Sequence, residues 1–182
     1  MNIKKHIPNA LTCGNLLSGC IGIVYAFNGE LKMVAFFVLI SGVLDFFDGF
    51  AARLLNVKSE IGKELDSLAD VISFGFLPGV LIFQMLQNLQ FGNWSYIGFL
   101  ITIFSALRLA KFNIDTRQTQ DFIGLNTPTN TFFIISLPWL IEDYPVINNE
   151  YLFLAITLIT SYLLISELKL FSLKFNGLAW EP

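Results

Sequence analysis

Four aspartates lie inside or beside the apolar segments of a very hydrophobic chain, in two closely spaced pairs. Asp45 and Asp48 are three residues apart, and Asp66 and Asp70 are four residues apart. An ionisable side chain in a membrane segment costs a few kcal/mol or more, so such residues are usually retained for a function. Converging carboxylates also repel one another unless cations neutralise them, and they are ligands that Mg²⁺ prefers. The spacing therefore predicts a divalent-metal site, and the metal predicts a phosphate-bearing substrate.

Small residues and an arginine separate the two acidic pairs. Five residues share one face of the second apolar segment if it is helical, within an arc of roughly 140°. They are Asp45, Asp48, Gly49, Ala52 and Arg53. On the next helix Gly62, Asp66 and Asp70 share a face because they are four residues apart. Helices joined by a short connection pack antiparallel, so the two acidic faces can meet. Without bulk at the glycines and the alanine, a flat ring or a backbone can approach closely, and an arginine can grip a phosphate with two hydrogen bonds.

A simpler interpretation of the same residues is structural. The acids could pair with Arg53 and Lys63, and the small residues could only pack helices together. Two acidic pairs that flank small residues inside a membrane are difficult to explain by packing alone, so we favour the metal site.

The composition is typical of a membrane protein. Of the 182 residues, 54% are hydrophobic and only 14% are charged, and the mean hydropathy is +0.64. Soluble domains have about 25% charged residues, and a soluble core of this size would leave much apolar surface in water. The length fits one membrane domain that covers residues 1–182.

Six segments have the length and apolar character of membrane-spanning helices, which need about 20 mostly apolar residues. They are residues 7–27, 31–55, 66–86, 94–114, 127–141 and 150–168. The fifth segment is short and is interrupted by Pro138. We therefore expect an all-α polytopic membrane protein with six transmembrane helices and with the aspartates at the facing ends of the second and third.

The basic residues predict the orientation of these helices. With six spans, ten of the eleven Lys and Arg residues fall on one side of the membrane, and Lys32 alone falls on the other, together with several acids. Because basic residues concentrate on the cytoplasmic side, both termini and the aspartates are expected there. We expect an integral protein of the cytoplasmic membrane with an active site that faces the cytoplasm.

The acidic segment resembles the signature of the CDP-alcohol phosphatidyltransferase family. The matching string is Asp45-x2-Asp48-Gly49-x2-Ala52-Arg53-x8-Gly62-x3-Asp66-x3-Asp70, with all eight fixed positions and their spacing intact. The resemblance implies an integral membrane enzyme with six transmembrane helices, commonly a homodimer. Such enzymes transfer a phosphatidyl group from a CDP-linked lipid to an alcohol and release CMP.

The resemblance also implies a function for each matched position. Asp45, Asp48 and Asp66 would bind divalent metal ions, Mg²⁺ or Mn²⁺ and two in number. Asp70 would lie close to these ions, complete the metal site and act as the catalytic base. The residues assigned to the cytidine nucleotide and its phosphates are Asp48, Gly49, Ala52, Arg53, Gly62 and Asp66.

Three further strings are similar to the phosphatidylserine synthase branch of the family. They run from His6 to Leu16, from Ala106 to Asn113 and from Phe122 to Asn130. The first string adds Asn9 and Asn15 as candidate contacts to the CDP-linked lipid. The branch implies CDP-diacylglycerol and L-serine as substrates, and phosphatidylserine and CMP as products.

The same strings supply candidates for binding the acceptor, which are Arg108, Lys111, Asn113 and Thr127. Two positions depart from the family pattern, because Lys111 stands where the family usually has Arg and Asn126 where it usually has Pro. A lysine keeps the charge but loses the two-point grip on a carboxylate. Arg108 is therefore the better candidate for the serine carboxylate.

Two alternatives remain open at the level of the sequence. The acceptor could be glycerol phosphate or inositol phosphate, although these anions would call for a denser cluster of basic residues. A divalent-cation transporter would also use intramembrane carboxylates. Against transport, the acids lie near one membrane face, and no inverted repeat is evident.

Overall fold

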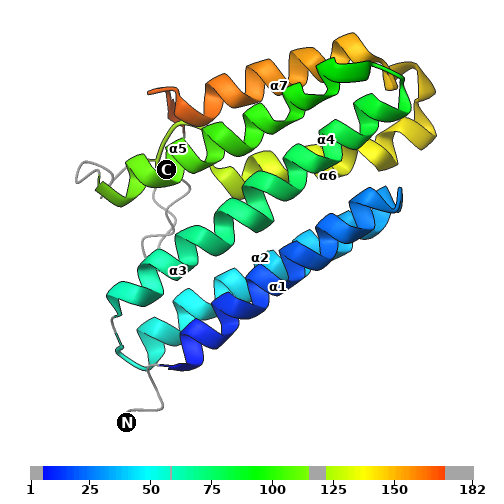
Figure 1. Cartoon of the computed structure of the whole chain (residues 1–182). Coiled ribbons are helices and arrows are strands. Elements are labelled where there is room, and N and C mark those ends of the chain that lie inside the picture. Colours follow the sequence, from blue (N-terminus) through cyan, green and yellow to red (C-terminus); the bar gives the residue numbers. More distant parts are fainter. Residues whose placement is uncertain (1–5, 58, 115–121, 171–182) are drawn as a thin grey trace, which may run out of the picture.

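The structure is a computed structural model that describes residues 6–57, 59–114 and 122–170, and this part of the chain is almost entirely helical (Figure 1). Its α-helices are α1 (His6–Phe27), α2 (Leu31–Leu54), α3 (Glu60–Asp70), α4 (Leu77–Asn88), α5 (Phe99–Ile114), α6 (Thr127–Asp143) and α7 (Glu150–Ile165). The shorter elements are the π-helical segment η2 (Val71–Phe76), the 3-10 segments η3 (Gly92–Gly98) and η4 (Pro145–Ile147), and the strands β1 (Phe122–Ile123) and β2 (Lys169–Leu170).

A continuous central helix organises the bundle. The elements α3, η2 and α4 form one helical rod, Glu60–Asn88, that runs between the α1–α2 pair and the α5–α7 pair (Figure 1). Of its most apolar window 61% is buried, against 33% or less in the other long helices. Phe74, Leu77 and Leu81 on this rod are fully buried. The central rod therefore contributes more residues to the apolar core than any other described helix does.

Among the described residues, four helices are long and apolar enough to cross a membrane: His6–Phe27, Leu31–Leu54, Glu60–Asn88 and Gly92–Ile114. These four correspond to the first four predicted spans and are typical of an integral membrane protein. The helices of the fifth and sixth predicted spans, α6 and α7, have 17 and 16 residues and are shorter. The all-α class is confirmed, whereas the count of six spans stays a prediction.

Two features of the predicted helices differ from the structure for a clear physical reason. The third helix begins at Glu60 rather than at residue 66, because Ser59 caps it by accepting a hydrogen bond from the backbone of Gly62 at 3.1 Å. The first turns of α3 are polar, so a search for apolar residues misses them. Pro138 does not interrupt the fifth predicted segment, because α6 continues through it as far as Asp143.

The π-helical segment η2 directly after Asp70 has no counterpart in the prediction. Side-chain hydroxyls from two neighbouring helices donate to its backbone carbonyls: Thr131 Oγ1 to Phe74 O at 2.6 Å, and Thr102 Oγ1 to Gly75 O at 3.2 Å. Its own Ser73 Oγ donates to the carbonyl of Asn15 on α1 at 3.1 Å. These bonds attach η2 to α1, α5 and α6 and satisfy carbonyls that a regular helix would use.

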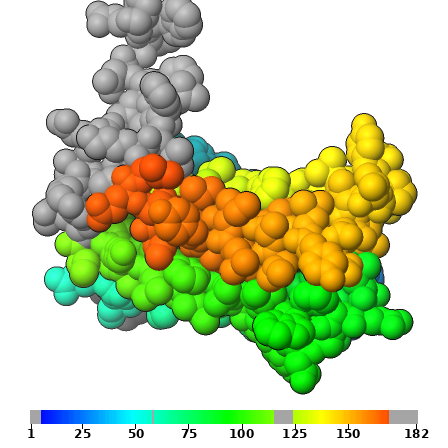
Figure 2. Space-filling model, turned by 90° about the horizontal axis from the view of Figure 1, so that it is seen from above, coloured from blue at the N-terminus to red at the C-terminus, as the bar shows by residue number. Residues whose placement is uncertain are grey.

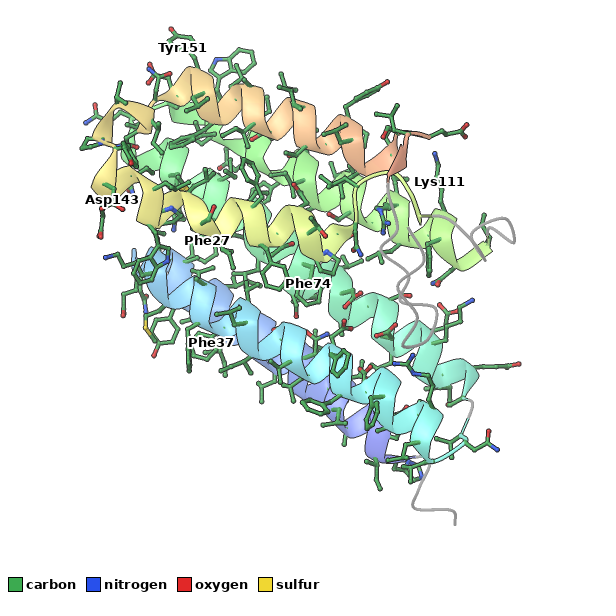
Figure 3. The ribbon with its side chains drawn as sticks, turned by 180° about the vertical axis from the view of Figure 1, so that it is seen from behind. Phe27, Phe37, Phe74, Lys111, Asp143 and Tyr151 are labelled. Carbon is green, nitrogen blue, oxygen red and sulfur yellow. The ribbon has the colours of Figure 1, made fainter. Side chains whose placement is uncertain are left out.

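Lys32 and the acids Glu30 and Glu142 gather at one end of the molecule, as the charge pattern predicted. Lys32 Nζ lies 2.5 Å from Glu142 and 4.7 Å from the centre of the Trp139 ring. Figure 3 shows Asp143 at this end and Lys111 at the other. Within the described residues, Lys32 and its acidic neighbours thus lie at the end opposite Lys111, and the orientation in the membrane stays a prediction.

The chain segments before α6 and after α7 are joined at the end opposite Lys32. Strand β1 pairs antiparallel with β2, and Leu125 N donates to Leu163 O at 2.9 Å. Figure 2 shows α7, in orange, along one face of the molecule with α5, in green, beside it. This connection places the first turn of α6, which begins at Thr127, next to the last turn of α7.

We predict that Gly98→Ala destabilises the protein. A Cβ atom at Gly98 would lie 2.8 Å from the carbonyl oxygen of Gly79 and from the amide nitrogen of Phe83, and backbone atoms cannot move aside cheaply. We expect a loss on the order of 1–3 kcal/mol, measured as a lower midpoint of thermal unfolding in detergent. Gly42→Ala is the matched control, because its Cβ would meet only the tip of Phe132 at 3.4 Å. Equal midpoints for the two variants would contradict the prediction.

Candidate functional site

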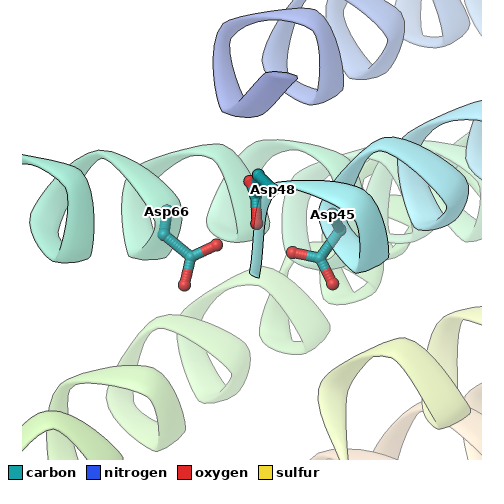
Figure 4. Close-up of side chains that lie close together, drawn as sticks. All are labelled: Asp45, Asp48 and Asp66. Atoms are coloured by element: carbon teal, nitrogen blue, oxygen red, sulfur yellow. The ribbon is translucent and has the colours of Figure 1, made fainter. Parts of the chain in front are cut away.

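Three of the four aspartates converge where α2 and α3 pass each other. Asp45 and Asp48 project from α2 and Asp66 from α3, and carboxylate oxygens of the three lie within 4.8 Å of one another (Figure 4). The antiparallel pairing of the two acidic helix faces is therefore as predicted. Asp48 is buried, with 7% of its surface exposed, and the other two are half-buried.

We call Asp45, Asp48 and Asp66 the carboxylate triad. Helix α1 contributes a hydrogen bond to it. Thr12 Oγ1 on α1 donates to Asp48 Oδ2 at 2.6 Å. A short hydrogen bond of this kind fixes the carboxylate and offsets part of the loss of hydration on burial. Thr12 was not among the predicted site residues, although it lies in the first string that resembles the family.

Asp70 lies beside the triad but is not one of the three mutually close carboxylates. It is the last residue of α3, and Asn15 Nδ2 on α1 donates to its Oδ1 at 3.4 Å. Asp45, Asp66 and Arg108 are within electrostatic range of its carboxylate. Asn15 is itself held by Ser41 Oγ, which donates to its backbone carbonyl at 3.2 Å. Asp70 therefore neighbours Asp45 and Asp66, and it has a hydrogen-bond partner of its own on α1.

A pocket of about 640 Å³ opens beside the triad between α1, α2 and α3. Its lining residues are Pro8, Asn9, Thr12, Asp48, Gly49, Ala52, Val57, Ser59, Glu60, Gly62, Lys63 and Asp66. At Gly62 a Cβ atom would lie 2.9 Å from Asn9 Oδ1, so any side chain there would push against the pocket wall. A Cβ atom added at Gly49 would have no neighbour within 4 Å outside its own helix, so the backbone there is open to a ligand.

Six of the eight residues predicted to contact the nucleotide and the CDP-linked lipid line this pocket. The two exceptions are Arg53 and Asn15. Arg53 is exposed, and its Nε donates to the carbonyl of Gly49 in the preceding turn at 3.1 Å. Asn15 is fully buried and contacts Asp70 instead. Ser59, Glu60 and Lys63 line the pocket but were not predicted as site residues.

The four predicted acceptor contacts divide into two groups. Arg108 and Thr127 are buried, with exposed fractions of 8% and 0%. Lys111 is exposed at the end of α5. Asn113 joins α5 to α3 by two hydrogen bonds. Its Nδ2 donates to Ser67 Oγ at 2.8 Å, and its backbone carbonyl accepts from Lys63 Nζ at 3.0 Å.

The carboxylate triad fits a hard divalent cation. Three carboxylates from two helices offer the oxygen ligands that Mg²⁺ and Mn²⁺ prefer. Within the part of the chain that the structure describes, no Lys or Arg forms an ion pair with any of the three. This absence of a protein countercharge disfavours the interpretation in which Arg53 and Lys63 neutralise the acids.

Comparison with known proteins covers almost all of the described chain. A family model described as CDP-alcohol phosphatidyltransferase matches residues 5–165, a range that ends with the last residue of α7. A Helicobacter pylori protein named CDP-diacylglycerol–serine O-phosphatidyltransferase is 35% identical over 89% of this chain and 70% of its own length. A Bacillus subtilis protein of the same name is 34% identical over 91% of this chain and 89% of its own length.

An archaeal relative shows the same pattern. A Methanothermobacter thermautotrophicus protein named archaetidylserine synthase is 31% identical over 87% of this chain and 70% of its own length. The similarity therefore extends over all the helices and is not confined to the aspartate segment.

We predict that Asp66→Asn weakens binding of Mn²⁺ by at least about tenfold, because the number of carboxylate charges largely sets the affinity of such sites. The measurement is a titration of the purified protein with Mn²⁺, in which electron paramagnetic resonance reports the free ion. Glu64→Gln removes an exposed carboxylate from the same helix, outside the triad, and is the control. Unchanged affinity in Asp66→Asn, or an equal loss in Glu64→Gln, would contradict the assignment.

Proposed function

Since the chain belongs to the CDP-alcohol phosphatidyltransferase family, we propose that it transfers the phosphatidyl group of CDP-diacylglycerol to L-serine and releases CMP. The observation that carries this proposal is the carboxylate triad at the wall of a 640 Å³ pocket. Serine as the acceptor is supported by the names of the relatives, which share serine although they differ in the lipid.

In this proposal the pocket between α1, α2 and α3 receives the cytidine nucleotide. Its glycines admit a flat ring close to the backbone. Lys63 also lines the pocket, and its ammonium group would exchange the Asn113 carbonyl for a phosphate oxygen. A smaller pocket of about 260 Å³ is lined by Asp45 together with apolar residues such as Phe46, Phe74 and Phe132. Its apolar walls suit a lipid tail whose phosphate end lies at the triad.

The proposed reaction is an in-line displacement at the β-phosphorus of CDP-diacylglycerol. The serine hydroxyl oxygen forms the new bond to this phosphorus, and the bond from phosphorus to the bridging oxygen breaks, so that CMP leaves with the electron pair. Asp70 accepts the hydroxyl proton as general base. Asn15 holds the Asp70 carboxylate by its hydrogen bond, and the π-helical segment that follows is bonded to α1, α5 and α6.

The triad completes the proposed site as the metal-binding group. Asp45, Asp48 and Asp66, with Asp70 close by, would hold two divalent cations, Mg²⁺ or Mn²⁺. When bound, such ions neutralise phosphate charge in the substrate and in the leaving CMP. Thr12 keeps the Asp48 carboxylate oriented for this task.

The arrangement in the membrane is also part of the proposal. The short helices α6 and α7 would complete six spans, with both termini and the triad on the cytoplasmic side of the cytoplasmic membrane, where serine is available. The separation of Lys32 and its acidic neighbours from the triad supports this orientation. The family resemblance further implies a homodimer, which cross-linking in native membranes would detect.

Two other functions make different predictions for the same experiment. Transfer to glycerol phosphate or inositol phosphate would release CMP with those acceptors and not with serine. A divalent-cation transporter would release no CMP at all. Family membership favours the transferase over the transporter.

We predict that the purified protein releases CMP from CDP-diacylglycerol in the presence of serine and Mg²⁺ or Mn²⁺, and that a chelator abolishes this release. Glycerol phosphate, inositol and inositol phosphate, tested separately, should give no release above the level without an acceptor. CMP release with one of these compounds and not with serine would show that serine is the wrong acceptor, while the type of reaction would remain as proposed.

We predict that Asp70→Asn lowers the rate of CMP release by at least about a hundredfold, since a positioned general base contributes roughly 10²–10⁴-fold. Binding of CDP to the same variant should stay within about twofold of the native value, because Asp70 does not line the nucleotide pocket. Asp143→Asn, at the opposite end of the bundle, is the control. A native rate in Asp70→Asn would refute Asp70 as the base.

A further inference from the structure

Several buried side chains in the described part of the chain have polar atoms without a hydrogen-bond partner. Three of these side chains are Arg108 (Nε) on α5, and Thr127 (Oγ1) and Asn130 (both amide atoms) on α6. The exposed fractions of these residues are 8%, 0% and 1%. A buried polar group without a partner is destabilising, and in native proteins such groups call for an explanation, for example a ligand.

Two neighbouring hydroxyls do have partners. Thr131, four residues after Thr127, donates to the Phe74 carbonyl of the π-helical segment, and Thr102 on α5 donates to that of Gly75. Ser105 Oγ, which packs against Gly75, has no partner within the described residues. The unpartnered atoms on α5 therefore extend from the level of Gly75 to Arg108.

The run of the helices places the unsatisfied groups at the level of Asp70. Ser105 on α5 packs against Gly75, where an added Cβ would lie 3.0 Å from that of Ser105, and Arg108 follows one turn later. In the opposite direction, Asp70 precedes Gly75 by five residues on the antiparallel central rod. Consistent with this register, the Arg108 guanidinium is within electrostatic range of the Asp70 carboxylate.

The same reasoning applies to α6. Thr131 contacts Phe74, and Thr127 lies one turn earlier on the same face, toward the end of the rod that carries Asp70. Asn130 lies between these two levels, three residues after Thr127. This register places Arg108 on α5, and Thr127 and Asn130 on α6, toward the end of the rod that carries Asp70.

We infer that Arg108, Thr127 and Asn130 form an acceptor subsite for a zwitterionic amino acid, in which Asn130 is a specificity-determining residue. The Arg108 guanidinium binds the carboxylate of the acceptor. The Asn130 carbonyl and the Thr127 hydroxyl oxygen accept hydrogen bonds from its ammonium group, and the acceptor hydroxyl points to Asp70. This inference rests on the proposed function, which it deepens by stating how the acceptor is recognised.

The charges around this subsite favour a zwitterion over an anion. Within the described residues, Arg108 is the only buried basic side chain, and it faces an acidic site. A phosphorylated alcohol would bring two more negative charges and would need further cations. An amino acid adds no net charge, and its ammonium and carboxylate groups suit the acceptor atoms of Asn130 and Thr127 and the donor atoms of Arg108.

Binding of ligands that lack one group each tests this subsite. Labelled serine is bound to the native protein in detergent with Mn²⁺ and CDP, which permits binding without turnover. Ethanolamine, which lacks the carboxylate, and 3-hydroxypropanoate, which lacks the ammonium group, compete for the site. We expect serine to bind more tightly than either.

Each variant should affect only the ligands that carry the matching group. Arg108→Gln should weaken serine and 3-hydroxypropanoate by at least about tenfold and ethanolamine by less than about twofold, given the strength of a hydrogen bond to a charged group. Asn130→Leu should weaken serine and ethanolamine and leave 3-hydroxypropanoate within about twofold. Ser95→Ala removes another buried, unpartnered polar atom, in η3, and should change none of the three.

The variant Asn130→Asp distinguishes a change in ligand preference from a general loss of binding caused by misfolding. It keeps an oxygen acceptor of the same size but adds a negative charge, so it should shift the preference toward ethanolamine and away from 3-hydroxypropanoate. A damaged fold cannot strengthen one ligand relative to another in this way.

The outcomes separate the two proposals. Equal weakening of all three ligands and of CDP, or no weakening in Arg108→Gln and Asn130→Leu, would overturn the subsite. CMP release with serine alongside that result would leave the proposed function standing. Serine binding with the expected variant pattern but without CMP release would uphold the subsite and refute the transferase reaction. Absence of serine binding to the native protein would overturn the subsite, whichever acceptor supports CMP release.

Discussion

Mutual repulsion of carboxylates is the constraint on which the rest of the structure depends. Asp45, Asp48 and Asp66 lie within 4.8 Å of one another on two different helices, and each ionised pair at such distances repels by on the order of 3–4 kcal/mol at an effective dielectric constant of 20. Nothing in α2 and α3 alone would keep these faces together. Both helices pack against α1, and the buried apolar surface of the central rod, with Phe74 and Leu77 at its middle, holds this arrangement together. The acidic site therefore depends on a core one or two turns away from it.

The π-helical segment links this core to the chemistry. It begins directly after Asp70, and hydroxyls on α5 and α6 hold its carbonyls. A π-helical turn inserted into an α-helix changes the direction in which neighbouring side chains point, and such turns are frequent at functional sites. Asp66 and Asp70 both lie on the regular helix α3, so their carboxylates share one face, and Asp70 is the one that meets Asn15 on α1. The hydrogen bonds of the π-helical segment to α1, α5 and α6 fix the position of the rod that carries both acids.

Much of the candidate site could be predicted because its residues are close in sequence. Residues 45–70 span a single helical hairpin, so helical periodicity and a short connection were enough to bring Asp48 and Asp66 together and to place Gly49, Ala52 and Gly62 around one pocket. The contributions of α1 were harder to foresee. Thr12 contacts Asp48 across 36 residues, and a lone threonine in an apolar helix is usually read as packing. Arg53 has the right spacing for the site, yet it turns back along its own helix to bond Gly49.

The sequence by itself determined the all-α class, the first four long apolar helices, the pairing of the acidic faces and the gathering of Lys32 with acids at the opposite end. Each of these follows from composition or from the period of one helix, which neighbouring residues report without help from the rest of the chain. Only the tertiary structure decided that Arg108 and Thr127 are buried while Lys111 is exposed, that Asn130 joins them, and that a π-helical turn follows Asp70. These features depend on how α5 and α6 rotate and slide against the central rod. Packing between distant segments sets that rotation, and no local pattern of residues encodes it.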